Sequence, residues 1–158
     1  MSMNEIAPTP TYNRRKNAIL LEYWESLCKD GKLPRESDID FDVLKDLWEN
    51  CFLIQMRDFN QETQHGNFTY LGKKLSDAYG EGALSSDGVP NLVTTDINSI
   101  HEACQEVQRT RQPVTNEGTV TLHDDVVLAF RQCLVPLTDG KDEIFSVLGR
   151  MEFHKYAD

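Results

Sequence analysis

The stretch that most constrains this chain is residues 126–153, where two apolar β-type runs flank the pair Asp139-Gly140. Such a pair between apolar runs is a strong signal for a tight β-hairpin. A two-residue turn that pairs Thr138 with Lys141 gives the facing pairs Leu134–Phe145, Gln132–Val147, Phe130–Gly149, Leu128–Met151 and Val126–Phe153. A loop that is one or two residues longer is the alternative, and a slip of one residue would undo this pattern. Because side chains alternate along a strand, these residues share one face. The hairpin therefore has an apolar face that other elements must cover, with the ring of Phe130 opposite a glycine.

Composition limits the classes of protein to which this chain can belong. Its 158 residues suit one domain with a sizeable core, and no apolar run approaches the roughly 20 residues that span a bilayer. The N-terminus lacks the basic and apolar regions of a secretory signal. Cys28, Cys51, Cys104 and Cys133 are widely spaced, which favours reduced thiols over disulfides or a zinc site. We therefore expect a cytoplasmic protein.

The net charge of −10 bears on the choice of partners. A negative field repels the phosphate backbone of nucleic acids and the anionic surfaces of membranes. We therefore expect neither nucleic acid nor a membrane as a partner.

Helical patterns alternate with connectors over the first two thirds of the chain. We expect a flexible tail over residues 1–12, which hold two prolines, and a single domain over 13–158. Helical spacing of apolar residues predicts a helix over 13–28 and a long helix from about residue 95 to Arg111. Shorter helices are predicted over 40–49 and 73–79, and the turn-rich stretch 80–90 is predicted to be a mobile loop.

Three further strands are predicted over residues 51–57, 66–71 and 115–122. Two strands, helices and then three strands indicate one α+β domain. We expect a five-stranded antiparallel sheet covered by helices on one face, with an additional N-terminal helix that is available to the other face.

Several short motifs, in this order and spacing, resemble the PAS domain, and more narrowly the stand-alone bacterial PAS proteins of the PAS-5 (DUF1457) type. The motifs are Leu21-Glu22-Tyr23-Trp24, Leu33-Pro34-x-x-x-Asp38-Ile39-Asp40, Tyr70-Leu71-Gly72-x-x-Leu75-x-x-x-Tyr79-Gly80, Leu134-Val135-Pro136-Leu137-Thr138-Asp139-Gly140 and Val147-Leu148-Gly149. The resemblance implies a sensory or interaction module that holds a small ligand between sheet and helices, or pairs with a protein through its sheet face and N-terminal helix. Because no output domain follows residue 153, we expect any signal to leave through a partner.

Two features of the sequence bear on whether the chain binds flavin or haem, which are cofactors of some PAS proteins. The segment 50–55 partly resembles the flavin-binding motif of light-oxygen-voltage domains, but it lacks the arginine after Cys51 and enters a strand. His101 lies on the long helix that carries the axial ligand in haem-binding PAS sensors, although a lone histidine at a helix edge is more often a surface residue. We expect neither flavin nor haem. We also predict no catalytic residue and no metal ligand, because no nucleophile has an evident base and no histidines have metal spacing.

The predicted ligand pocket lies between the sheet and the helices. Gln132 is the one polar side chain on the apolar face of the predicted hairpin, and a buried amide there needs a ligand, a water or a neighbouring residue as partner. Core packing is the alternative for all the candidates, which are Phe68, Tyr70, Leu75, Tyr79, Ile100, His101, Cys104, Phe130, Gln132 and Val147.

The predicted interface involves the N-terminal helix and the outer sheet face, and it would serve a protein partner or a homodimer. Its candidates are Leu20, Tyr23, Trp24, Leu27, Ile144 and Leu148. Together these features suggest a non-enzymatic cytoplasmic PAS sensor that acts through protein–protein interaction. The alternative is an α+β enzyme or carrier for a small molecule, which requires a perturbed acid or base inside the pocket.

Overall fold

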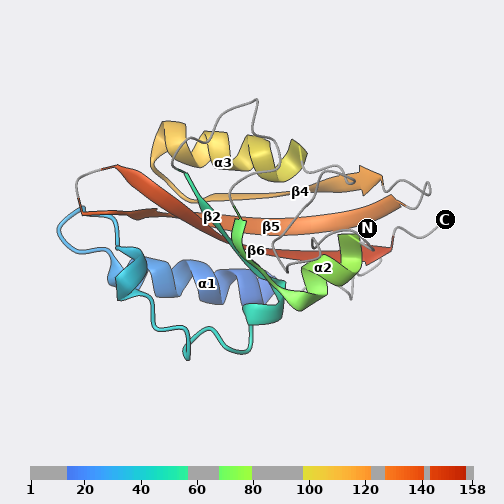
Figure 1. Ribbon diagram of the computed structural model, residues 1–158, viewed down its shortest axis with the longest axis horizontal. Helices are drawn as coiled ribbons and strands as arrows, with labels where there is room; N and C mark the ends of the chain where they lie inside the picture. Colours follow the sequence, from blue (N-terminus) through green and yellow to red (C-terminus); the bar gives the residue numbers. More distant parts are fainter. Residues whose placement is uncertain (1–13, 57–67, 80–97, 122–126, 141–142, 156–158) are drawn as a thin grey trace, which may run out of the picture.

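A computed structural model describes residues 14–56, 68–79, 98–121, 127–140 and 143–155 (Figure 1). Its helices and strands are α1 (Arg14–Leu27), the 3-10 helices η1 (Glu36–Asp38) and η2 (Trp48–Asn50), β2 (Cys51–Gln55), β3 (Phe68–Leu71), α2 (Lys73–Tyr79), α3 (Asn98–Thr110), β4 (Val114–Thr121), β5 (Val127–Thr138) and β6 (Ile144–Lys155). The predicted tail (1–12) and loop (80–90) lie outside the described residues.

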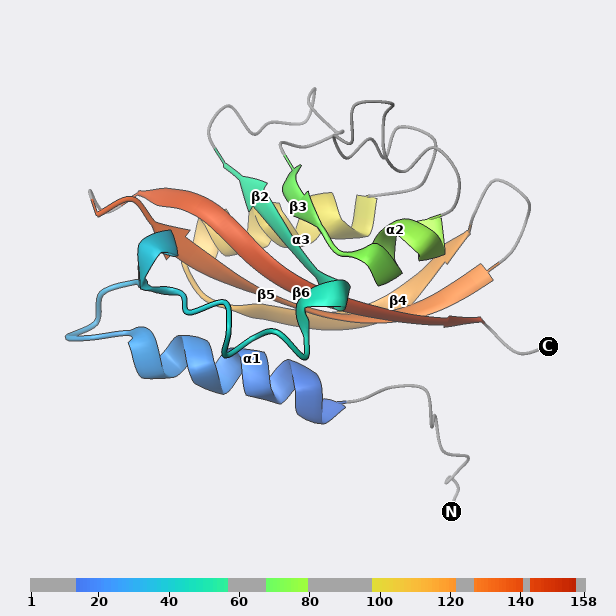
Figure 2. The same ribbon diagram turned by 60° about the horizontal axis from the view of Figure 1, so that its bottom comes forward.

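The strands form one antiparallel sheet in the order β3-β2-β6-β5-β4. Figure 2 shows α3 and α2 on one side of the sheet and α1 on the other. We call these sides the α3 face and the α1 face. The architecture confirms the predicted α+β class and the five-stranded antiparallel sheet, with both faces carrying a helix.

The predicted register of the long hairpin is wrong, although its faces are right. Phe130 pairs with Phe153 rather than with Gly149, and Gln132 pairs with Met151 rather than with Val147. Thr138 pairs with Ile144 at an irregularity in the ladder, so the connection spans residues 139–143 instead of two residues. The displacement from Gly149 to Phe153 is four positions, an even number, and the alternation of side chains therefore survives.

Two apolar clusters fill the two sides of the sheet. Phe130 and Val147 belong to the same cluster on the α3 face, together with Ile100, Cys104 and Val107 of α3. On the α1 face, the second cluster comprises Leu20 and Trp24 of α1, strand residues Cys51, Leu53, Cys133, Val135, Leu137 and Leu148, and connector residues Ile39, Leu44 and Leu47. The predicted common face of Phe130 and Val147 is thereby confirmed.

Two glycines let aromatic rings lie against the sheet on the α3 face. A Cβ at Gly149 would be 2.2 Å from Cζ of Phe52, which is its partner across β2 and β6. Phe130 does lie over a glycine, but that glycine is Gly118 of β4, where a Cβ would be 3.1 Å from its Cζ. The predicted pairing of Phe130 with Gly149 is therefore wrong, because Gly149 pairs with Phe52 and Phe130 pairs with Gly118.

The helix predicted over residues 40–49 is replaced by turns that end in η2. In these turns the backbone N of residue i+3 donates to the carbonyl of residue i, as from Val43 N to Asp40 O at 3.0 Å and from Leu47 N to Leu44 O at 2.8 Å. Leu44 and Leu47 are buried while Phe41 and Val43 are exposed. These turns bring two leucines to the sheet without the regular face that a helix would need.

No helix within the described residues combines the length and apolar character needed to cross a membrane.

Candidate functional site

The apolar cluster between the sheet and α3 contains five of the ten predicted pocket residues. Leu75, Ile100, Cys104, Phe130 and Val147 lie in the cluster on the α3 face, and none of them is more than 4% exposed. Their side chains come from α2, α3, β5 and β6. The structure thus brings together residues that are far apart in the sequence.

Gln132 supplies a polar group to this apolar layer. It is 0% exposed, and its Nε2 donates a hydrogen bond of 2.9 Å to Oδ1 of Asn116. Asn116 is its register partner on β4 and is itself exposed. The amide pair therefore runs from the buried layer to the β4 edge of the sheet, where Asn116 reaches solvent. The expected partner of the Gln132 amide is a ligand, a water or a neighbouring residue. The structure supplies a neighbouring residue, Asn116.

Tyr70 does not belong to this layer, contrary to the prediction. It pairs with Leu53, which faces α1, while the neighbouring pair Leu71 and Phe52 faces α3. Its ring stacks on Trp48 with 4.2 Å between centroids, and its hydroxyl donates to Trp48 O at 2.9 Å. Burial raises the pKa of Tyr70 to about 12, so the hydroxyl remains a donor.

Three other pocket candidates cannot be placed within the layer. The backbones of Phe68, Tyr79 and His101 lie in β3, α2 and α3, but their side chains lie outside what the structure describes.

Cys104 is the titratable candidate whose side chain is described in the α3 layer. Burial alone raises the pKa of its thiol far above the ordinary value. A thiol that stays protonated is a poor nucleophile. Moreover, none of the residues described as buried is an Asp or Glu. These groups offer no acid–base pair of the kind that an enzyme would require.

Cys51 begins β2 and faces α1, on the side of the sheet opposite the candidate pocket. Its thiol donates to Leu47 O at 3.3 Å, and burial raises its pKa to about 12. The prediction that Cys51 is a strand residue is confirmed. Within the described residues, no group of three or more His, Cys, Asp or Glu side chains could hold a metal ion.

A buried cation anchors α1 to the sheet. Arg150 of β6 is 1% exposed, and its Nη1 donates to Oδ1 of Asn17 at 2.9 Å. Its Nη2 pairs with Oε1 of Glu152. Nearby, Nε1 of Trp24 donates to Pro136 O at 2.8 Å. These bonds fix α1 on its face of the sheet, in addition to the apolar contacts.

The predicted interface residues are largely covered within the chain, so their expected exposure is wrong. Leu20, Trp24 and Leu148 are at most 6% exposed because α1 packs on the sheet. Tyr23 and Leu27 are partly buried on the same face, and the Tyr23 hydroxyl accepts from Asp40 N at 2.7 Å. Ile144 packs against the α3 cluster instead.

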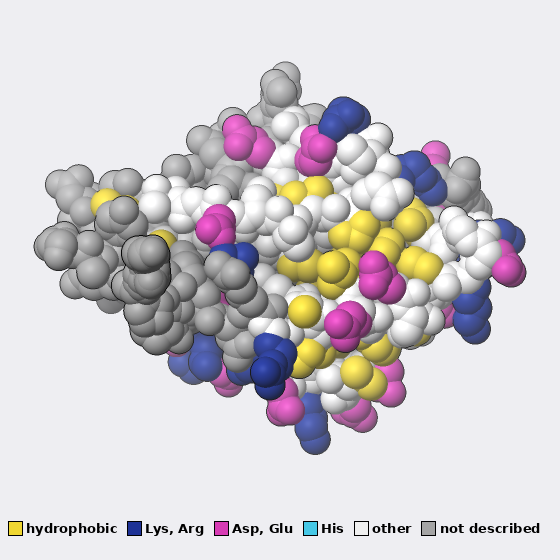
Figure 3. Space-filling view, turned by 180° about the vertical axis from the view of Figure 1, so that it is seen from behind, with side chains coloured by type: hydrophobic (Ala, Val, Ile, Leu, Met, Phe, Trp, Pro, Cys, Tyr) yellow, Lys and Arg dark blue, Asp and Glu magenta, His cyan; other side chains and the backbone are white. Residues whose placement is uncertain are grey.

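Other apolar surface remains on the molecule. The view from behind shows hydrophobic side chains gathered together with acidic side chains among them (Figure 3). A groove of about 210 Å³ runs between α1 and the sheet, lined by Asn17, Ala18, Leu21, Thr115 and Arg131. Arg131 is paired there with Glu117 of β4.

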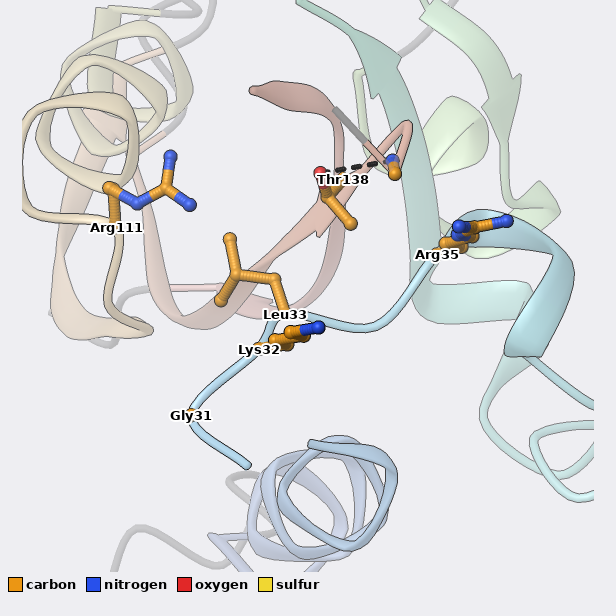
Figure 4. A pocket seen from close by; sticks show the side chains of 7 residues that line it. Gly31, Lys32, Leu33, Arg35, Arg111 and Thr138 are labelled. Atoms are coloured by element: carbon orange, nitrogen blue, oxygen red, sulfur yellow. Dashed lines mark hydrogen bonds between the residues drawn. The ribbon is translucent and has the colours of Figure 1, made fainter. Parts of the chain in front are cut away.

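A cavity that was not predicted lies where the connector after α1 meets the end of α3 and the turn between β5 and β6 (Figure 4). Its volume is about 440 Å³, and its lining residues are Gly31, Lys32, Leu33, Arg35, Arg111, Thr138 and Gly140. The three-residue spacing of Lys29, Lys32 and Arg35 was visible in the sequence. The convergence with Arg111 was not, since it depends on how α3 packs.

Comparison with known proteins assigns the architecture to a class. The order β3-β2-β6-β5-β4 with helices on both faces defines an α+β domain built on a five-stranded antiparallel sheet. A family model described as "PAS domain" matches residues 13–152. This chain belongs to the PAS domain family. A search of curated proteins found no match.

Solved structures with low sequence identity are also similar. One is a PAS domain from Colwellia psychrerythraea, at 10% identity and a TM-score of 0.46, covering 73% of this chain and 96% of that one. Another is the PAS domain of Bordetella pertussis BvgS, at 15% identity and 0.42, covering 75% and 86%. A third is the LOV domain of a blue-light activated histidine kinase from Erythrobacter litoralis, at 13% and 0.45, covering 67% and 95%. The family assignment rests on the family model.

Proposed function

We propose that this PAS domain is a sensory module that holds a small ligand between the sheet and α3 and signals through a partner protein. The observation that carries the proposal is the buried amide of Gln132 on the same face of the sheet as the described apolar cluster. Binding sites for small molecules are mostly apolar with a few placed polar groups that fix orientation. The bond from Gln132 to Asn116 holds the amide in place for such a role.

The arrangement favours binding over catalysis. Within the described part of the α3 layer, the thiol of Cys104 is protonated and no buried carboxylate is present. An enzyme or carrier with acid–base chemistry needs titratable groups poised near the working pH. Gln132 does not titrate, so it can orient a ligand but cannot transfer a proton.

In this proposal, the partner protein binds on the α1 face. The groove beside Ala18 and Leu21 and the apolar side chains exposed near α1 offer contact area outside the ligand layer. Because the sheet separates the two layers, a change on the α3 face can reach a partner through the strands that both layers share. A homodimer is the other occupant of this surface that the PAS family suggests.

Native mass spectrometry of protein purified from its own cell tests the ligand. We expect a non-covalently bound mass on the wild-type chain and its loss in Gln132→Leu, which removes the polar group at similar volume. The matched control is Thr119→Val, which makes a polar-to-apolar change at an exposed position of β4. Wild-type protein without any bound mass would contradict the ligand part of the proposal, as would binding that survives in Gln132→Leu.

A further inference from the structure

Three segments that are distant in the sequence build a cationic cavity at one end of the molecule. Lys32 and Arg35 come from the connector after α1, Arg111 follows α3, and Thr138 and Gly140 belong to the end of β5 and its turn. Figure 4 shows the Arg111 side chain extending toward Thr138, with Leu33 between the two sides. A second cavity of about 380 Å³ shares Gly31, Lys32, Leu33 and Arg111. Among the described residues, no carboxylate belongs to the lining of either cavity.

The charges of this cavity are unusual for a chain of net charge −10. Lys32 and Arg35 form no ion pair with the described residues, whereas Lys73, Lys74, Arg109, Arg131 and Arg150 all do. Two carboxylates of the connector have hydrogen-bond partners other than these cationic side chains. Glu36 accepts from Oγ of Ser146 at 3.1 Å, and Asp38 accepts from the backbone N of Arg35 at 2.9 Å. The two cations therefore retain their capacity to bind an anion.

Helix ends do not account for these two cations. The carbonyl end of a helix favours cations, but the effect falls off within the last turn. Arg111 directly follows α3, where its backbone N donates to Val107 O at 2.7 Å with φ of 59°, so it occupies a helix-capping position. Lys32 and Arg35 lie five and eight positions beyond Leu27, the last residue of α1. Their gathering at the cavity therefore needs another explanation.

Backbone hydrogen bonds preorganise the cavity wall. Thr138 N donates to Pro34 O at 2.9 Å, which ties the connector to β5. Gly140 N donates to Oγ1 of Thr138 at 3.2 Å, and that hydroxyl donates to Glu143 O at 2.8 Å. Gly140 has φ of 92°, and a Cβ there would be 2.7 Å from Nη2 of Arg35. The absence of a side chain at Gly140 thus lets the Arg35 guanidinium lie against the turn.

We propose that this cavity binds a small phosphorylated molecule that carries at least two negative charges. An arginine guanidinium matches phosphate oxygens in a two-pronged geometry, and a lysine adds a mobile point charge. The volume of about 440 Å³ lies within the range of small-molecule sites. This site is separate from the ligand layer under α3, so the proposal goes beyond the proposed function. A bound anion would bridge the connector, the end of α3 and the β5–β6 turn.

Titration with inorganic pyrophosphate at constant ionic strength tests this site, with calorimetry for affinity and amide NMR for location. We expect saturable binding that shifts the amides of Gly31, Leu33 and Gly140. The variant Lys32→Gln/Arg35→Gln should weaken binding about tenfold or more, since each charge-assisted bond contributes that much. The matched control is Lys45→Gln, which removes an exposed cation outside the cavity. Both sites of the double variant are exposed, so its fold should be retained, which circular dichroism checks.

Each outcome decides the proposal. Pyrophosphate binding that is lost in the double variant and kept in Lys45→Gln supports it. Absence of saturable binding at millimolar pyrophosphate overturns it, and so does an equal loss in Lys45→Gln, which would indicate nonspecific attraction. Citrate at the same ionic strength serves as a second arm. If citrate binds as tightly as pyrophosphate, the assignment to phosphate chemistry is overturned.

Discussion

Gly149 sets the closest packing on the α3 face. The ring of Phe52 lies over it so closely that a Cβ would be 2.2 Å from Cζ, a distance at which something must move. Phe52 is fully buried, and its ring therefore has little room to shift. Because Gly149 has no side chain, β2 and β6 can pair while the ring of Phe52 lies over Gly149 on the α3 face.

Replacing Gly149 with Ala should destabilise the fold by about 1–3 kcal/mol, the usual cost of overpacking a core. Urea unfolding measures the change. The double variant Gly149→Ala/Phe52→Leu separates the ring from other causes, because a smaller side chain leaves space for the new methyl group. We expect the cost of Gly149→Ala to shrink in the Phe52→Leu background. An equal cost in both backgrounds would show that the ring is not responsible.

Residue-level sequence patterns placed some residues of the candidate site on the correct face of the sheet and others on the wrong face. Phe130 and Val147 share a face as predicted because strand alternation is insensitive to a register displacement of four positions. The prediction for Tyr70 is wrong because strand alternation places it on the opposite face from its neighbour Leu71. Gln132 was found because a polar residue interrupts an apolar face, but its bond to Asn116 needs the pairing of β4 with β5.

At the scale of elements, α1 is held by polar anchors as well as by apolar contacts. The bond between Asn17 and the buried guanidinium of Arg150 is a polar link in the first half of the helix. Removing one partner leaves a buried charged donor without its acceptor, which costs more than losing an exposed hydrogen bond. This amide should therefore make a measurable contribution to the docking of α1, beside the Trp24 bond and the apolar contacts.

Asn17→Ala should lower the free energy of unfolding by about 1.5–3 kcal/mol. It should also speed hydrogen exchange in α1 more than in α3. Ser26→Ala is the matched control, since Ser26 lies on the same helix and its exposed hydroxyl bonds only to Tyr23 O at 2.6 Å in the described structure. An effect of Asn17→Ala no larger than that of Ser26→Ala would contradict the anchoring role.

The elements themselves were easier to predict than their connections. The hairpin strands and α3 have regular apolar patterns, so the sequence located them well. The sequence predicts a two-residue turn at Asp139-Gly140, but an irregularity in the ladder at Thr138 lengthens the connection to residues 139–143. The segment 41–47 has helical spacing but forms successive turns, because only Leu44 and Leu47 find places in the core. The local sequence pattern does not determine the loop length or the turns, because both depend on tertiary packing.

At the scale of the whole molecule, the sheet divides the PAS domain into two layers with different chemistry. In its described part, the α3 layer combines an apolar cluster with the amide of Gln132, while the α1 layer contains a buried cation and two protonated thiols, Cys51 and Cys133. The cationic cavity lies at one end, where both layers meet the β5–β6 turn. No run of sequence could reveal this cavity, because its walls come from three separate segments.

The central claim is that the α3 layer is the ligand site, and hydrogen–deuterium exchange tests it most directly. Protein purified from its own cell is compared with the same protein after unfolding in guanidinium, dialysis and refolding, which removes a bound ligand. We predict faster exchange in α3 and β4 after stripping, with α1 unchanged, because the ligand stabilises only the layer that it contacts. Identical exchange in the two preparations, or a change confined to α1, would contradict the claim.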